Sequence, residues 1–130
     1  MNRVFLDTHF LIALLDTSDS KHIEARRLVS QLPISTNLLT TDEVLVEFLN
    51  GFSGRGPLMR RMAAKYVHFL RQDSRTQVFP QSRASFDAGL AFYEARHDKG
   101  YSLVDCSSMT TMRRLARIGR SWTASSRITP

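Results

Sequence analysis

The feature that most constrains the fold is an alternation of short apolar runs with segments of helical periodicity. Residues 4–6 form an apolar run that ends at Asp7, and the nearly all-apolar residues 8–15 follow, which is the pattern of a buried strand feeding a buried helix. Residues 34–39 and 77–79 are two further strand candidates, each followed by a helical pattern. Strands that alternate with helices indicate a parallel sheet covered by helices, so the sequence predicts a single α/β domain.

Residues that favour helix starts precede several of these helical patterns. The cluster Ser18-Asp19-Ser20 predicts the start of one helix, and Thr40 with Glu43 resembles a capping box at the start of the next. Ser82 and Ser102 are placed to cap the last two helices.

The charge of the chain is unevenly distributed. The formal net charge is +6, yet residues 1–50 hold seven acids and four bases, whereas residues 51–130 hold five acids and fourteen bases. No acid follows Asp105. A basic excess favours a polyanionic partner such as nucleic acid or an anionic membrane surface. On the opposite side of the amphipathic helix predicted over residues 58–70, Arg60, Arg61 and Lys65 are candidates for binding an RNA backbone, although such a face is also typical of plain solvent exposure.

Several classes of protein are excluded by composition. A single cysteine, Cys106, permits neither an internal disulfide nor a cysteine-based zinc cluster. Hydrophobic residues make up 42% of the chain, which argues against disorder throughout. The longest apolar stretch, residues 4–15, is interrupted by Asp7 and His9 and is too short to cross a bilayer. Because it also lacks the features of a signal peptide, we expect a cytoplasmic protein without a membrane segment.

Three carboxylates lie in apolar segments at corresponding places in strand–helix units. Asp7 ends a strand, Glu47 lies within an apolar helical pattern, and Asp105 lies in the first turn of a helix. Buried carboxylates are costly unless they pair or bind a cation, and hard oxygen ligands suit Mg²⁺ or Mn²⁺. Simpler roles stay open: Asp7 could cap a helix, Asp105 could complete a capping box with Ser102, and Glu47 could pair with an arginine.

Three segments resemble the PIN domain, and in particular the small bacterial proteins that are the toxin half of toxin–antitoxin pairs. These segments are Phe5-Leu6-Asp7-Thr8, residues 40–50, and the run from Asp98 to Cys106, and the resemblance covers roughly residues 3–117. It implies a three-layer α/β/α sandwich with a short, mostly parallel sheet of about four strands.

The resemblance also implies a function and a set of site residues. It implies a Mg²⁺- or Mn²⁺-dependent endoribonuclease in which Asp7, Glu47 and Asp105 are catalytic and hold the metal, with Asp98 as an additional metal-site acid. Thr8 and Thr41 match supporting polar positions. A cognate antitoxin protein and homodimerisation are implied as well.

The C-terminal residues 118–130 depart from this pattern. The family usually supplies another acid here, but Ser125 stands where that acid is expected. We therefore expect weakened metal binding. An alternative function is a PIN-like module that binds RNA or a protein partner without cleavage, and a third is a metal-dependent phosphatase of small molecules.

Overall fold

A parallel sheet forms the centre of the molecule. The computed structural model describes residues 2–116 and 127–128. In it, β1 (Arg3–Leu6), β2 (Asn37–Thr41) and β3 (Thr76–Phe79) pair in parallel. A two-residue strand, β4 (Arg127–Ile128), pairs with the other edge of β1, so the strand order is β3-β2-β1-β4.

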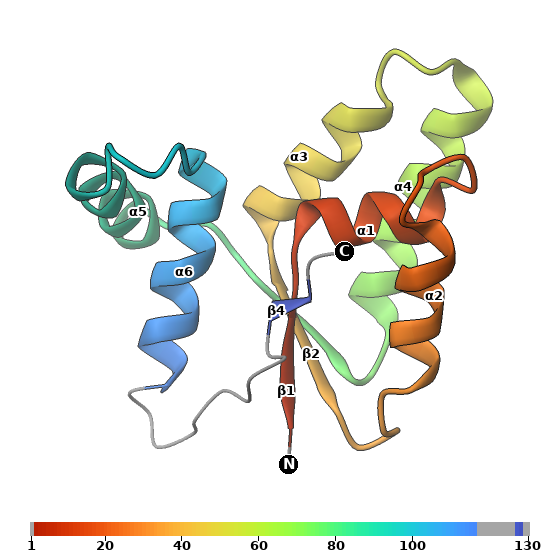
Figure 1. Cartoon of the computed structure of the whole chain (residues 1–130), viewed down its shortest axis with the longest axis horizontal. Coiled ribbons are helices and arrows are strands. Elements are labelled where there is room, and N and C mark those ends of the chain that lie inside the picture. Colours follow the sequence, from red (N-terminus) through yellow and green to blue (C-terminus); the bar gives the residue numbers. More distant parts are fainter. Residues whose placement is uncertain (1, 117–126, 129–130) are drawn as a thin grey trace.

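Helices cover both faces of this sheet, which confirms the predicted α/β/α arrangement (Figure 1). The first four helices lie on one side, and the hairpin of the last two lies on the other. None of the described helices is long and apolar enough to cross a membrane. The helices are α1 (Thr8–Leu15), α2 (His22–Ser30), α3 (Asp42–Phe52), α4 (Pro57–Gln72), α5 (Arg83–Ala95) and α6 (Leu103–Ala116).

The core explains why β1 and α1 have such continuous apolar sequences. All four residues of β1 are buried, because helices pack on both faces of the strand. Phe5, Phe10, Phe48 and Phe52 are completely buried, and the rings of Phe48 and Phe52 meet edge to face with centroids 5.2 Å apart. Burial of these large side chains anchors α1 and α3 over the sheet.

The predicted boundaries of the second strand were wrong. It begins at Asn37, not at Ile34, which is 91% exposed, and it continues through Thr41. The capping box of Thr40 with Glu43 was also wrong. The side chain of Thr41 caps α3 by accepting the N–H of Val44, whereas the hydroxyl of Thr40 donates to the carbonyl of Leu6 at 2.9 Å. A buried threonine hydroxyl can form a hydrogen bond with a neighbouring strand, so a strand can continue through polar residues. For this reason β2 extends beyond its apolar run.

The other predicted caps had mixed outcomes. Ser82 caps α5 in a reciprocal capping box with Ser85, as predicted. By contrast, no side chain caps α2. The Asp19 carboxylate instead accepts the N–H of Lys21 at 2.8 Å, so the polar cluster closes a turn just before the helix.

Close packing of α5 on α6 requires a glycine at residue 89. A Cβ atom there would lie 2.3 Å from Oγ and 3.2 Å from Cα of Ser107. We expect Gly89→Ala to lower the free energy of unfolding by about 1 kcal/mol, because overpacking outweighs the gain in helix propensity. Urea unfolding would measure this change. Making the substitution in a Ser107→Ala background should reduce the loss, since the closest atom is gone, and an increase in stability in the native background would contradict the packing argument.

Candidate active site

The carboxyl ends of the parallel strands meet at one edge of the sheet, the upper edge in Figure 1. Helices α1 and α3 begin there directly after β1 and β2, and α6 also begins at this edge. Helix α3 contacts both α1 and α6. Because open parallel sheets bind ligands outside the carboxyl ends of their strands, this edge is the first place to look for a functional site.

Asp7 lies at this edge and is only 3% exposed. It caps α1, because its Oδ1 accepts the backbone N–H of His9 at 2.9 Å. The simpler role of Asp7 as a helix cap is therefore confirmed. The adjacent Thr8 is also buried, and its hydroxyl has no hydrogen-bond partner among the described residues. A buried hydroxyl of this kind is uncommon and is suited to a water or ligand at the same place.

Asp105 forms the capping box that the sequence left open. Its backbone N–H donates to Oγ of Ser102 at 3.0 Å, and the Ser102 N–H donates to Oδ2 of Asp105 at 3.2 Å. The box fixes the half-buried Asp105 side chain in the first turn of α6. Asp98 lies in the turn before that helix and is exposed.

Glu47 is half-buried in the second turn of α3. Within residues 2–116, the ion pairs join Lys21 to Glu24 and Arg55 to Asp16, so the alternative pairing of Glu47 with an arginine is not seen. One turn earlier, Glu43 is 8% exposed and its Oε1 lacks a hydrogen-bond partner in the described part.

Sequence reasoning missed Glu43 because it assigned the residue to a cap. Burial raises the pKa of its carboxyl group above the usual value, and the nearby charge of Asp42 acts in the same direction. The four-residue spacing of Glu43 and Glu47 places both on one face of α3 and was the available signal.

The oxygen donors at this edge have the chemistry that Mg²⁺ and Mn²⁺ prefer. The orphaned buried oxygens of Thr8 and Glu43 also fit a site that receives a further partner. As the side chains stand, however, no three acidic, histidine or cysteine side chains of the described residues lie close enough to hold one ion. The carboxylates would therefore have to approach one another when a metal binds.

The remaining candidates are distributed over the fold. Thr41 caps α3, because its hydroxyl oxygen accepts the N–H of Val44. Arg60, Arg61 and Lys65 are exposed on α4, and Nη1 of Arg60 donates to the Ser53 carbonyl at 3.0 Å. Cys106 is completely buried, and burial raises the pKa of its thiol, so it is not suited to act as a nucleophile.

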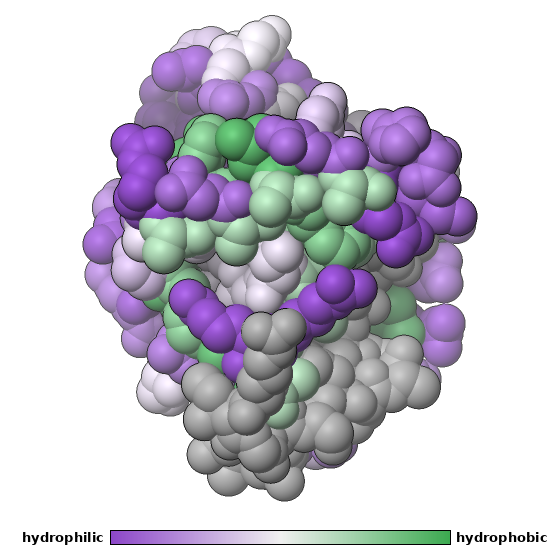
Figure 2. Space-filling view, turned by 90° about the vertical axis from the view of Figure 1, so that its left-hand side faces the viewer, coloured by the Kyte–Doolittle hydropathy of each residue, from purple (hydrophilic) through white to green (hydrophobic). Residues whose placement is uncertain are grey.

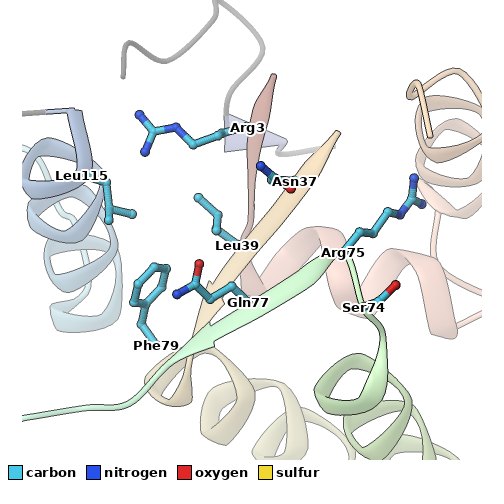
Figure 3. A pocket seen from close by; sticks show the side chains of 8 residues that line it. All are labelled: Arg3, Asn37, Leu39, Ser74, Arg75, Gln77, Phe79 and Leu115. Carbon is cyan, nitrogen blue, oxygen red and sulfur yellow. The ribbon is translucent and has the colours of Figure 1, made fainter. Parts of the chain in front are cut away.

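A separate cavity of about 380 Å³ lies between the sheet and α6 (Figure 3). Phe79 and Leu115 form apolar parts of its wall, while Arg3, Asn37 and Gln77 add polar groups. None of the predicted acidic residues lines it. This cavity and the carboxylate edge are thus different places. The full lining consists of Arg3, Asn37, Leu39, Ser74, Arg75, Gln77, Phe79 and Leu115.

Comparisons with known proteins agree with this fold. The model of the PIN domain family matches residues 4–117. The structure is similar to that of the Mycobacterium tuberculosis toxin VapC20, described as a Sarcin-Ricin loop cleaving toxin, with a TM-score of 0.77 and 25% sequence identity over 87% of this chain and 83% of that one. A search of curated proteins gave no match. Because the family model spans most of the sequence, the chain belongs to the PIN domain family.

Proposed function

We propose that this protein is a divalent-metal-dependent endoribonuclease that acts in the cytoplasm as the toxin of a toxin–antitoxin pair. The observation that carries the proposal is that Asp7 at the start of α1, Glu47 on α3 and Asp105 on α6 belong to helices that begin at the carboxyl edge of the sheet. Helix α3 also contacts both of the other helices. Membership of the PIN family and the similarity to an RNA-cleaving toxin support RNA as the substrate.

In this proposal the four acids Asp7, Glu47, Asp98 and Asp105 hold Mg²⁺ or Mn²⁺. Such an ion activates water and neutralises charge on the phosphodiester. The caps give Asp7 and Asp105 defined positions before any ion binds, since each side chain is tied to a backbone N–H. Thr41 caps α3, and the buried Thr8 hydroxyl lies beside Asp7 as a supporting polar group. The exposed cations Arg60, Arg61 and Lys65 are candidates for holding the RNA backbone.

The absence of an acid at residue 125 predicts a weakened affinity for the metal, which can be measured. Ser125, at the position where the family usually supplies an acid, lies outside the described residues. We expect Ser125→Asp to tighten Mn²⁺ binding about tenfold, because another carboxylate adds negative charge near the ion. Titration calorimetry of the purified protein would measure the affinity, with Ser126→Asp as a control of equal charge. Equal affinities of wild type and Ser125→Asp would contradict the proposed loss.

We further propose that the protein forms a homodimer and is blocked by a cognate antitoxin, as its relation to VapC toxins suggests. Light scattering of the purified chain tests the first part, with twice the mass of one chain as the expected result. Co-expression with the product of an adjacent reading frame, followed by purification of the complex, tests the second.

A second candidate function is RNA or protein binding without cleavage. It is favoured by the present positions of the acids: Asp7 and Asp105 both serve as helix caps, and no three acids of the described residues are gathered. Incubation with structured RNAs in Mn²⁺ or in EDTA separates the two functions. The nuclease produces fragments only with the metal, whereas the binding module gives a salt-sensitive mobility shift and no fragments.

A further inference from the structure

A hollow between α5 and α6 is lined by positive charge and small side chains. It measures about 320 Å³, and its walls include Ala84, Ser85 and Ala88 of α5 with Thr110, Arg113 and Arg114 of α6. The wall from α5 is the first turn of that helix and the turn after it, and the first turn contains no acidic residue. Figure 2 faces this side of the molecule, where hydrophilic residues (purple) surround a band of paler and more hydrophobic ones (green). The alanines leave space beside the two guanidinium groups.

Aromatic contacts hold one of these arginines in a defined orientation. The guanidinium carbon of Arg113 lies 4.8 Å from the ring centroid of Phe92, and that of Arg96 lies 5.9 Å from the same centroid. A guanidinium that stacks on a ring keeps its N–H groups free to donate to a planar or tetrahedral anion. The Phe92 ring thus orients the guanidinium group of Arg113, and it also contacts that of Arg96 just after α5, before a ligand arrives.

These arginines lack the usual acidic partners. No carboxylate of residues 2–116 forms an ion pair with Arg96, Arg113 or Arg114. The sequence contains no Asp or Glu after Asp105, so the C-terminal residues supply no acidic side chain either. Two hydroxyls beside the hollow already have internal partners, because Thr110 donates to the Ser107 carbonyl and Ser85 belongs to the α5 capping box, and Thr111 adds a third hydroxyl to the lining. The guanidinium groups are thus the charged groups with which the hollow can bind an anion.

We propose that this hollow binds a phosphate of the RNA backbone, with Arg113 and Arg114 as the contacting cations and Phe92 beneath the guanidinium group of Arg113. The inference rests on the proposed function in taking RNA as the ligand. Asp105 lies eight residues before Arg113 on α6, which is about 12 Å along the helix axis. The bound phosphate is therefore separated from the bond that is cut, and the site sets how the strand lies on the enzyme.

Binding without cleavage tests this assignment. The anisotropy of a labelled single-stranded RNA is measured in EDTA between about 50 and 200 mM salt. For Arg113→Gln/Arg114→Gln we expect about tenfold weaker binding, and a salt slope smaller by about 0.7, since the loss of one phosphate contact on a single strand removes about 0.7. The matched control is Arg26→Gln/Arg27→Gln, which removes two exposed charges from α2. It should leave the slope unchanged and alter affinity by less than about twofold, because α2 lies on the other side of the sheet.

A third variant separates orientation from charge. Phe92→Leu keeps every cation but removes the ring beneath two of them, so the affinity should fall by a few fold while the salt slope stays near that of the wild type. Thermal unfolding of each variant shows whether it is folded under the assay conditions. Equal effects of the α6 and α2 double variants would overturn the proposal, and so would an absence of RNA binding by the wild type.

The failure of this site and the failure of the nuclease proposal give different results. A wild-type protein that binds RNA through Arg113 and Arg114 but produces no fragments with Mn²⁺ contradicts the nuclease and supports the phosphate site. A wild-type protein that cleaves, with an α6 double variant that binds and cleaves equally well, supports the nuclease and overturns the phosphate site.

Discussion

Asp7→Asn is expected to lower metal-dependent RNA cleavage by about 100-fold or more while leaving the fold intact. The Asp7 side chain has two roles, as the cap of α1 and, in our proposal, as a metal ligand, and the substitution removes only the second. Its Oδ1 accepts the N–H of His9, and an asparagine oxygen can accept the same hydrogen bond. The negative charge that would hold the divalent ion is lost, and such an ion contributes several kcal/mol to stabilising the reacting phosphate. Cleavage of total RNA, measured at several Mn²⁺ concentrations, would show the loss.

Asp19→Asn is a closely matched control for that experiment. Its Oδ1 accepts the N–H of Lys21, two residues ahead, just as Asp7 accepts that of His9. The residue lies between α1 and α2, away from the start of α3 and α6. Asp19→Asn should therefore cleave at the wild-type rate, and both variants should unfold at nearly the wild-type temperature. Full activity of purified Asp7→Asn protein would rule out the proposed role of this carboxylate.

The order of strands and helices could be predicted from the sequence because it follows from local patterns. The apolar run of residues 4–6 in β1 indicated a strand buried on both faces, and the helical periodicity of the apolar residues in α4 indicated an amphipathic helix. The boundaries of β2 could not be predicted in this way. Thr40 and Thr41 satisfy their hydroxyls through contacts that only the folded chain provides, one with β1 and one with the start of α3.

The candidate site, like the fold, could be predicted only in part from the sequence. Asp7 and Glu47 follow β1 and β2 at one edge, as the strand–helix alternation indicated. The expectation of a strand–helix unit at Asp105 was wrong, because α6 follows α5 and not a strand. The burial of Glu43 depends on the packing around α3, and the hollow beside Arg113 depends on how α5 crosses α6 at Gly89 and Ser107. The four-residue spacing of Glu43 and Glu47 was the available signal for the first arrangement, whereas the hollow has no periodic signature because it arises between two helices.

The Asp16 carboxylate joins two loops that precede α2 and α4. It accepts the hydroxyl of Ser18 at 2.6 Å and the Ser18 N–H at 3.0 Å, and it forms an ion pair with Arg55. The guanidinium of Arg55 in turn lies 4.8 Å from the centroid of the buried Phe52 ring. The hydrogen bonds from Ser18, and then that from Arg55, lower the pKa of Asp16 below its usual value.

Because the pKa is lower in the folded state, the ionised Asp16 stabilises the fold above the pKa that it has when unfolded, near 4. This stabilisation is lost as the pH falls through the folded-state pKa. We expect Asp16→Asn to lower the free energy of unfolding by about 1.5 kcal/mol at pH 7, since Arg55 is partly exposed and its ion pair contributes modestly. The difference from wild type should shrink as the pH is lowered below about 4.

Urea unfolding of both proteins between pH 7 and pH 3 measures this difference. Arg55→Gln serves as the companion variant, because it removes the ion pair but leaves both hydrogen bonds from Ser18 in place. It should cost less than Asp16→Asn at pH 7, since Ser18 has the larger effect on the carboxylate. A stability difference between wild type and Asp16→Asn that stays constant across this pH range would show that the charge of Asp16 does not stabilise the two loops.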